Sequence, residues 1–215
     1  MTKLQVAIDL LKTEDAIALA TKVAPFIDII ELGTPLIKSE GLSVITAMKE
    51  AFPDKKVFAD FKTADAGALE AEMAFQAGAD YITILGATGD ATISGAVEAA
   101  KKFNKAVVVD TIGVKDRVKR AQEVIKLGVE FVELHAGLDE QAEPGYSIQV
   151  LIDEASRAGV PVSIAGGVNQ NSIEGVKKSG AVVAVAGAAI YGAEDPAAAA
   201  KALKEALMAD LIPNN

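Results

Sequence analysis

Three charged side chains in the segment ADFKTADAG are the first residues of this sequence that suggest chemistry. Asp60, Lys62 and Asp65 follow the spacing Asp-x-Lys-x-x-Asp. Alternation along a β-strand would put Asp60 and Lys62 on one face, and Asp65 in the next turn could reach Lys62 or a neighbouring subunit. Flanking carboxylates keep a lysine ammonium charged, which favours electrostatic stabilisation or proton transfer over attack by a neutral amine. The alternative is a structural ion-pair network that ties a loop to the strand.

The only histidine of the chain, His135, is the second candidate. A lone histidine is usually an ordinary packing or surface residue. Here it follows an apolar run and precedes Ala136-Gly137, a position that favours a functional role. Imidazole exchanges protons near neutral pH, so His135 is the natural general base, and Glu133 shares its face of the predicted strand.

Oxygen donors predict a metal site. One histidine and no cysteine cannot supply the several nitrogen or sulfur ligands of a zinc centre. A catalytic ion should therefore be hard and oxygen-ligated, with Mg²⁺ as the first candidate and Mn²⁺ as the second. Glu31 and Asp60, on adjacent predicted strands, are the best ligand pair, and water and substrate oxygens would complete the octahedron.

Two strand ends that contain glycine, Gly166-Gly167 and Gly187-Ala188, predict a phosphate site. Glycine lets backbone amides approach an anion, and a helix N-terminus adds positive potential. Glycine also closes turns without any ligand. The inference therefore depends on both pairs occurring together, at the last two predicted strands.

Eight short apolar runs, each followed by a longer amphipathic segment, must position these residues. The predicted strands are Leu4–Leu10, Ile27–Leu32, Val57–Phe61, Tyr81–Gly86, Ala106–Ile112, Phe131–Gly137, Pro161–Gly167 and a last strand from Val182 or Val183 to Ile190. Nearly continuous apolar strands that alternate with helices indicate a parallel sheet. Asp195-Pro196 should begin the last helix. A glycine should close the helix before each of four strands, namely Gly78, Gly128, Gly159 and Gly180.

The expected fold is α/β, a single (β/α)8 TIM barrel over residues 1–215. Eight strands at this length fit a closed barrel better than a doubly wound sheet, and no Gly-x-Gly-x-x-Gly follows the first strand as in a Rossmann fold. Such barrels hold their active sites at the C-terminal strand ends. Polar residues gather there in this sequence: Asp9, Glu31, Asp60, Lys62, Asp110 and His135. Any one could be a surface residue at a strand exit, but six on one rim indicate a site, because buried carboxylates need a partner or a metal.

The composition excludes several classes of protein. The formal net charge of −9, from 30 acidic and 21 basic residues, would repel nucleic acid or an acidic membrane. The absence of cysteine removes disulfides, thiolate metal sites and cysteine nucleophiles. The N-terminus shows no signal-peptide pattern, and no apolar run approaches the length of a membrane span, so a cytoplasmic location is expected.

Over essentially its whole length the chain resembles the hexulose-6-phosphate synthases, a family of orotidine-phosphate-decarboxylase-like barrels. The resemblance is carried by LQVAIDL, IDIIELGTPLI with EGLSVI, ADFKTADAG, HAGLDEQA, and IAGGV with VAGAAIYGA. It implies an aldehyde-lyase that condenses formaldehyde with D-ribulose 5-phosphate in an Mg²⁺-dependent aldol reaction, through a metal-stabilised enediolate. Such an enzyme would serve formaldehyde fixation in one-carbon metabolism or formaldehyde detoxification.

The resemblance also implies a role for each matching position. Glu31 and Asp60 match the metal ligands, Lys62 and Asp65 the catalytic pair, His135 the proton-transfer histidine, Asp9 a substrate hydroxyl partner, and Gly166-Gly167 with Gly187-Ala188 the phosphate site. The family is typically dimeric, so a homodimer is expected, with Asp65 reaching the partner's site.

Three alternatives stay open. The related 3-keto-L-gulonate-6-phosphate decarboxylases carry an arginine where this chain has Leu138, and commonly another where it has Ala188. These departures favour the synthase, but they leave open which residue supplies positive charge to a phosphate. A Schiff-base aldolase would use Lys62 as its nucleophile. A non-catalytic sugar-phosphate-binding barrel would use the rim charges structurally.

Overall fold

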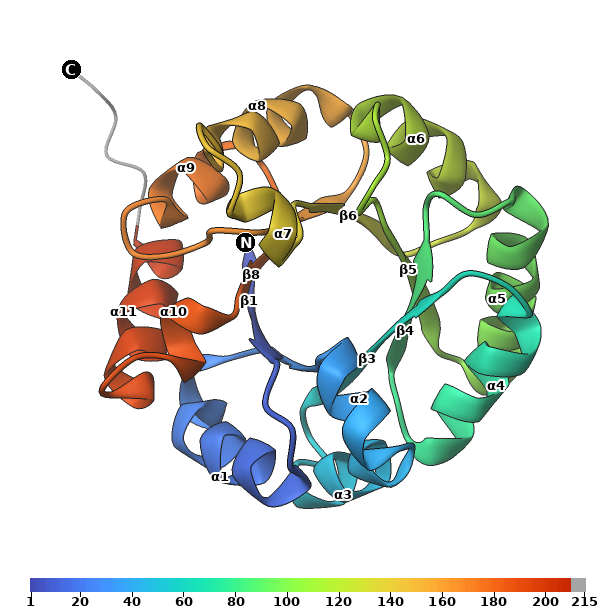
Figure 1. The fold of residues 1–215 in the computed structure, drawn as a ribbon, viewed down its shortest axis with the longest axis horizontal. Coiled ribbons are helices and arrows are strands. Elements are labelled where there is room, and N and C mark those ends of the chain that lie inside the picture. Colours follow the sequence, from blue (N-terminus) through green and yellow to red (C-terminus); the bar gives the residue numbers. More distant parts are fainter. Residues whose placement is uncertain (210–215) are drawn as a thin grey trace.

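Eight runs rich in Val, Ile and Ala form the parallel strands of a closed barrel in the computed structural model, which describes residues 1–209 (Figure 1). Each strand pairs with the next in the chain, and the last pairs with the first. This confirms the predicted (β/α)8 barrel. The strands are β1 (Lys3–Ile8), β2 (Ile29–Leu32), β3 (Lys56–Thr63), β4 (Tyr81–Leu85), β5 (Ala106–Asp110), β6 (Phe131–His135), β7 (Val162–Ala165) and β8 (Val183–Ala186).

Helices connect the strands, because parallel neighbours need a crossover from one end of the barrel to the other. Most of them surround the ring, while α2 and α7 lie closer to its axis (Figure 1). The helices are α1 (Thr13–Val23), α2 (Thr34–Glu40), α3 (Ser43–Ala51), α4 (Gly67–Ala77), α5 (Asp90–Phe103), α6 (Arg117–Val124), α7 (Leu138–Gln141), α8 (Gln149–Ala158), α9 (Ile173–Lys178), α10 (Ala188–Tyr191) and α11 (Pro196–Met208), with short 3-10 turns at Ala24–Phe26 and Ile125–Leu127.

The predicted helix ends are confirmed. The side chain of Asp195 accepts a hydrogen bond from the Ala198 amide at 3.0 Å, and Pro196 opens α11. The predicted glycines all have positive φ, a backbone conformation that other residues adopt at a cost. These are Gly78, Gly128, Gly159 and Gly180.

The strand limits differ from the prediction mainly at the mouth of the barrel. The last strand ends at Ala186 rather than Ile190, and Ala188–Tyr191 forms α10 instead. Short apolar runs look alike in a strand and in a buried helix, so composition alone does not place this boundary. Strand β3, by contrast, extends beyond Phe61 to Thr63 through an irregular pairing with β4.

Other limits move by one or two residues. Strands β1, β4, β5, β6 and β7 end before the predicted Leu10, Gly86, Ile112, Gly137 and Gly167, because the chain leaves the sheet to form the loops of the mouth. Strand β2 begins at Ile29 rather than Ile27, since Ile27 follows the Ala24–Phe26 turn.

The interior of the barrel changes from apolar to polar along the strands. Its lower part is apolar, and the rings of Phe58, Tyr81 and Phe131 lie about 6 Å apart there. Residues two positions further along a strand point to the same side. The inward positions therefore continue toward the mouth as Glu31 after Ile29, Asp60 after Phe58, Thr83 after Tyr81, Asp110 after Val108, and Glu133 after Phe131.

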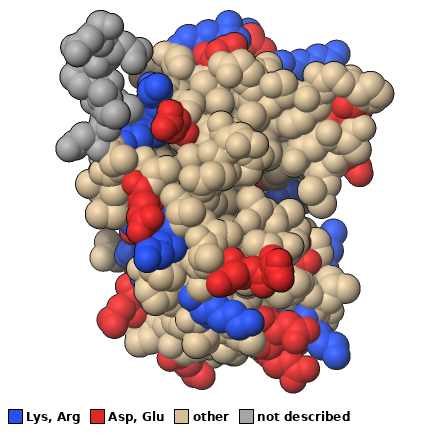
Figure 2. All heavy atoms as spheres, turned by 90° about the vertical axis from the view of Figure 1, so that its left-hand side faces the viewer, with Lys and Arg blue, Asp and Glu red and all other residues tan. Residues whose placement is uncertain are grey.

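The outer surface mixes both signs of charge. Figure 2 shows the side of α9, α11 and α1, where Lys and Arg side chains lie beside Asp and Glu side chains. Within residues 1–209 no helix has the length and apolar character needed to span a membrane.

Candidate active site

The C-terminal strand ends surround an open cavity of about 1000 Å³. Every predicted site residue except Asp65 lines it: Asp9, Glu31, Asp60, Lys62, His135, Gly166, Gly167, Gly187 and Ala188. Parallel strands that close into a barrel bring their ends to one rim, so residues from all parts of the chain meet here.

Lys62 lies between two buried carboxylates. Its Nζ atom is 2.6 Å from Oδ2 of Asp60 and 3.2 Å from Oδ2 of Asp110. Burial by itself would lower the pKa of Lys62, but the charges of Asp60 and Asp110 outweigh it and hold the pKa above its ordinary value. The amine is therefore protonated at neutral pH. This charge state opposes the Schiff-base alternative, which needs a neutral nitrogen.

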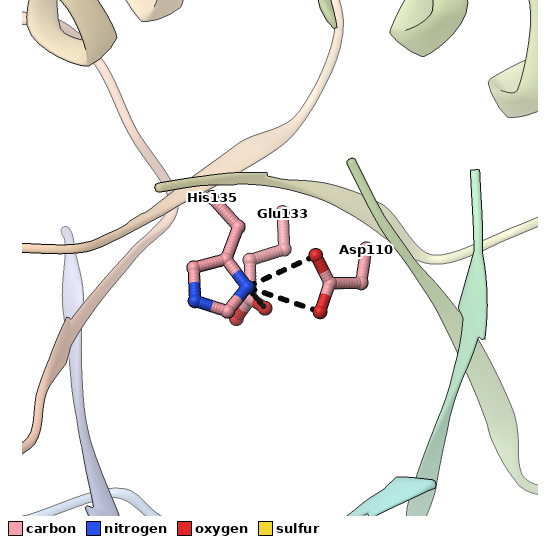
Figure 3. A group of neighbouring side chains, drawn as sticks. All are labelled: Asp110, Glu133 and His135. Atoms are coloured by element: carbon pink, nitrogen blue, oxygen red, sulfur yellow. Dashed lines mark hydrogen bonds and ion pairs between the residues drawn. The ribbon is translucent and has the colours of Figure 1, made fainter. Parts of the chain in front are cut away.

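His135 is oriented by Asp110. Its Nδ1 atom lies 3.0 Å from both carboxylate oxygens of Asp110 and 3.6 Å from Oε2 of Glu133 (Figure 3). A proton on Nδ1 would be donated to Asp110, which leaves Nε2 as the free basic nitrogen. In Figure 3 this second nitrogen points away from both carboxylates. The arrangement suits a base whose tautomer is fixed by its neighbour.

Asp110 is the residue whose importance the sequence did not reveal. Sequence reasoning placed it on the rim without a role, yet it contacts both Lys62 and His135. Its side chain is fully buried, which raises its pKa, but His135, Lys62 and the Ile112 amide outweigh that effect and hold the pKa below its ordinary value. The sequence did contain one indication of this role: Asp110 lies two positions after Val108 and therefore shares its inward face of the strand.

Two buried glutamates line the cavity together with Asp60, Lys62 and His135. Glu31 and Glu133 are 6% and 3% exposed. Burial, together with the charge of Asp60 on Glu31 and of Asp110 on Glu133, raises both pKa values well above the ordinary range.

The two glutamates differ in their hydrogen bonds. Gln5 donates from Nε2 to Oε1 of Glu31 at 2.5 Å, whereas Oε1 of Glu133 has no hydrogen-bond partner in the described part of the chain. The sequence did not point to Gln5 as a site residue, because it lies in the middle of an apolar strand.

The donors fit a hard divalent cation. Glu31 and Asp60 are buried and line the same cavity, and burial followed by the charge of Asp60 raises the pKa of Glu31, which a bound cation would counteract. Asp110, Glu133 and His135 also bring potential ligand atoms within 4.8 Å of one another. However, the oxygens of Asp110 already contact Lys62, His135 and the Ile112 amide. Asp60 is engaged as well, by Lys62, Thr34 and Thr83, so the choice of Glu31 and Asp60 as ligands stays a prediction.

Asp9 lies on the same rim, after β1. Burial and the neighbouring charge of Asp60 raise its pKa from the ordinary value. A carboxyl group that lines the cavity in this way can accept a hydrogen bond from a sugar hydroxyl.

The two glycine pairs directly follow β7 and β8 and line the cavity, and β8 lies across the ring from β3 and β4 (Figure 1). Gly166 and Gly167 have φ values of 120° and 92°, and the carbonyl of Gly166 accepts a hydrogen bond from the Tyr146 hydroxyl at 2.6 Å. Gly187 precedes the four-residue helix α10. The basic side chains that line the cavity are those of Lys62 and His135, so an anion at the glycines would rely on backbone amides.

Two other residues bear on the alternatives. Asp65 is exposed and lies outside the cavity, and its carboxylate is not among the ion-pair partners of Lys62. Of the two directions that the sequence left open for Asp65, the one toward Lys62 of the same chain is not taken, because the turn carries Asp65 away from the strand end. Leu138, at the start of α7, lines the mouth with an exposed apolar side chain.

Comparison with known proteins identifies the family and agrees with the barrel fold. The family described as Orotidine 5'-phosphate decarboxylase / HUMPS matches residues 2–203. The 3-hexulose-6-phosphate synthase of Mycobacterium gastri is 64% identical over 205 residues, which cover 95% of this chain and 99% of that protein. A crystal structure of 3-hexulose-6-phosphate synthase has a TM-score of 0.95 at 64% identity and covers 96% of this chain and 100% of its own. The 3-keto-L-gulonate-6-phosphate decarboxylase of Vibrio cholerae has a TM-score of 0.83 at 30% identity, with coverage of 96% and 97%.

Proposed function

Because this chain belongs to the Orotidine 5'-phosphate decarboxylase / HUMPS family, we propose that it is an aldehyde-lyase that condenses formaldehyde with D-ribulose 5-phosphate, the 3-hexulose-6-phosphate synthase reaction. The choice of substrates comes from the relative that is 64% identical over 95% of the chain. One observation carries the reaction type. A base with a fixed tautomer, His135, and a permanently charged lysine, Lys62, share the carboxylate of Asp110 in one cavity.

The residues divide the proton chemistry between them. His135 would take the proton from C1 of the ketose through Nε2, and the C1 carbon would then form a bond to the carbonyl carbon of formaldehyde. The aldehyde oxygen gains a proton and becomes the new hydroxyl group. Lys62 would donate hydrogen bonds to the oxygen that carries negative charge, or supply that proton. Formaldehyde is small, so it requires little more than space beside C1.

Glu31 and Asp60 would hold a divalent cation, with Mg²⁺ first and Mn²⁺ second. Their burial and mutual repulsion support this assignment. When bound, such an ion supplies Lewis-acid stabilisation of negative charge on the ketose oxygens. The remaining contacts orient the substrate. Asp9 would accept a hydrogen bond from a sugar hydroxyl. The backbone amides at Gly166-Gly167 and Gly187-Ala188 would bind the phosphate.

We also propose a homodimer in which Asp65 of one subunit reaches the cavity of the other. Asp65 precedes α4, on which Leu69 and Met73 are 61% and 38% exposed. These two residues are four positions apart and therefore lie on one face of the helix. An apolar face beside an exposed carboxylate suits contact with a second copy of the chain. A location in the cytoplasm stays a prediction from the sequence.

The test is an assay of formaldehyde consumption with D-ribulose 5-phosphate, with and without EDTA. We expect turnover that EDTA abolishes and added Mg²⁺ restores. His135→Ala and Asp60→Ala should each reduce kcat at least about 100-fold, as expected when a general base or the site of a metal is removed. Glu130→Gln, a change at an exposed acid before β6, serves as the control. Near-normal turnover in both active-site variants would discard the assignment.

The decarboxylase is the second candidate, since its structure shares the barrel at a TM-score of 0.83. Leu138 argues against it, because an apolar side chain at the mouth cannot donate a proton. Release of CO₂ from 3-keto-L-gulonate 6-phosphate faster than formaldehyde consumption would favour this candidate. A lysine adduct trapped by borohydride would instead identify a Schiff-base enzyme.

A further inference from the structure

Strand β3 contains an irregularity at the point where it carries the charged residues. Its pairing with β4 passes from Ala59 opposite Ile82 to Thr63 opposite Ile84. Three residues of β3, numbers 60–62, therefore face the single residue Thr83 of β4. Such a bulge interrupts the ladder and redirects side chains. Lys62 has a φ of 49° within it, a left-handed conformation that is strained for a residue with a side chain.

The hydroxyl group of Thr83 bonds both ends of this bulge. The amide of Lys62 donates to Oγ1 of Thr83 at 2.9 Å, and the Thr83 hydroxyl donates to Oδ1 of Asp60 at 2.8 Å. A hydroxyl has one proton to donate and lone pairs to accept, so both bonds can exist together. Thr83 is fully buried, and it is not among the residues that line the cavity.

We propose that Thr83 is a positioning residue of the active site, which fixes the carboxylate of Asp60 and the backbone of Lys62 through one buried hydroxyl. This inference rests on the proposed function, in which Asp60 holds the cation and Lys62 carries the positive charge. The amide of Lys62 bonds the Thr83 side chain instead of a carbonyl of the neighbouring strand. Loss of the hydroxyl would therefore leave a part-buried amide donor without this partner and release the strained turn.

The hydroxyl also determines which oxygen of Asp60 faces a cation. Oδ2 lies 2.6 Å from the ammonium of Lys62 and 3.0 Å from the hydroxyl of Thr34. Oδ1 accepts one bond, from Thr83. A carboxylate oxygen has two acceptor positions, so Oδ1 keeps one for a ligand. Thr83 thus orients the carboxylate with its less occupied oxygen available, in the manner by which outer residues orient metal ligands.

The experiment compares Thr83→Val, which keeps the shape without the hydroxyl, with Thr83→Ser, which keeps the hydroxyl. Two quantities are measured on the intact protein: kcat and KM for D-ribulose 5-phosphate, and the Kd of Mn²⁺ for metal-free protein from the free-ion electron paramagnetic resonance signal. We expect Thr83→Val to lower kcat and raise the Mn²⁺ Kd, each by about 10- to 100-fold. The KM should change much less, because Thr83 does not line the cavity. Thr83→Ser should stay within about threefold of wild type in both quantities, the range of context effects.

Thr2→Val is the matched control. Thr2 is another buried threonine, directly before β1 at the opposite end of the barrel, and its hydroxyl donates to the Ala181 carbonyl at 2.9 Å. Both valine variants lose a buried hydrogen bond and should lower the melting temperature. Only Thr83→Val should weaken Mn²⁺ binding.

The outcomes separate the two proposals. Wild-type protein that consumes no formaldehyde overturns the proposed function, whereas the Mn²⁺ measurement still tests Thr83. An active wild type with unchanged kcat and Mn²⁺ affinity in Thr83→Val overturns the role of Thr83 alone. So does a Thr83→Ser variant as defective as Thr83→Val. If Thr83→Val does not fold, Thr83→Cys takes its place, because a thiol is only a weak donor, and full activity in it would overturn the proposal.

Discussion

At the scale of single residues, the site depends on how four acids share one lysine and one histidine. Asp110 contacts both basic groups, and Asp60 contacts Lys62. Burial raises the pKa of Asp110, but His135, Lys62 and the Ile112 amide outweigh this effect and favour its ionised form. Glu31 and Glu133 differ from Asp110, because burial is the largest influence on their pKa values and raises both. The site thus combines an acid whose neighbours favour its charge with two acids that hold their protons more tightly.

The raised pKa of Glu133 predicts how stability depends on pH. Below the ordinary pKa of 4.5, this carboxyl is protonated in both the folded and the unfolded protein. As the pH rises above that value, the unfolded chain releases the proton first. The folded state then loses stability by up to about 1.4 kcal/mol per pH unit, until its own raised pKa is passed.

Glu133→Gln removes this loss while keeping the shape of the side chain. Relative to wild type, we expect the metal-free variant to become progressively more stable as the pH rises above the ordinary pKa of 4.5, in the direction that proton linkage requires. Urea unfolding at several pH values measures the difference. Glu130→Gln, at an exposed position before β6, should show no such trend. A stability difference that stays constant with pH for Glu133→Gln would contradict the assignment.

At the scale of secondary-structure elements, the ends of the strands shape the cavity. The bulge of β3 turns Asp60 and Lys62 toward each other, and the glycines after β7 let the chain turn away from the barrel wall. Gly166 shows why a side chain is excluded there. A Cβ atom on it would lie 2.5 Å from the carbonyl oxygen of Ala136, and its φ is 120°.

Gly166→Ala should therefore disturb both folding and binding. We expect a loss of about 1–3 kcal/mol in the free energy of unfolding, the usual cost of a strained backbone. The KM for D-ribulose 5-phosphate should rise as well, because the amides proposed to bind phosphate would shift. Denaturant unfolding and steady-state kinetics measure the two effects.

Gly159→Ala is the control that tests backbone strain without a change at the proposed phosphate site. Gly159 also has a positive φ, of 67°, but a Cβ there meets no atom within 4 Å. This variant should lose about 1–2 kcal/mol from the left-handed backbone alone, with an unchanged KM. An unchanged KM in Gly166→Ala would argue against a phosphate site at β7.

At the scale of the whole molecule, one barrel supplies all but one of the predicted site residues. Asp65 is the exception, and it lies on the outside beside the exposed apolar face of α4. The barrel is acidic, with a formal net charge of −9. Two copies would therefore associate through apolar contact more readily than through opposite charge.

Leu69→Glu tests the dimer. A charge in the centre of an apolar interface is costly to bury, so we expect the variant to sediment as a monomer at concentrations where wild type is a dimer. Its activity should fall with dissociation, because Asp65 would no longer reach a partner. Val150→Glu changes another exposed apolar residue, on α8, and should leave the dimer intact. A Leu69→Glu variant that stays dimeric would place the interface elsewhere.

The sequence alone was sufficient for the elements and for the identity of most candidate residues. Strand and helix periodicity are local properties, and so are the glycines that end helices and the acids that follow apolar runs. Eight such units predict a barrel, and a barrel predicts a common rim. The spacing of Asp60 and Lys62 predicts that their side chains meet, although the bulge in β3, not regular alternation, brings them together.

The contacts between side chains of different strands depend on the tertiary structure. The contacts of Asp110 with His135, of Thr83 with Asp60 and of Gln5 with Glu31 each join different strands. Their geometry depends on the register between neighbours and on the bulge in β3, which closure of the whole ring determines. The exposed position of Asp65 has the same cause. Backbone preferences act over a few residues, whereas contacts across a barrel depend on the packing of the entire chain.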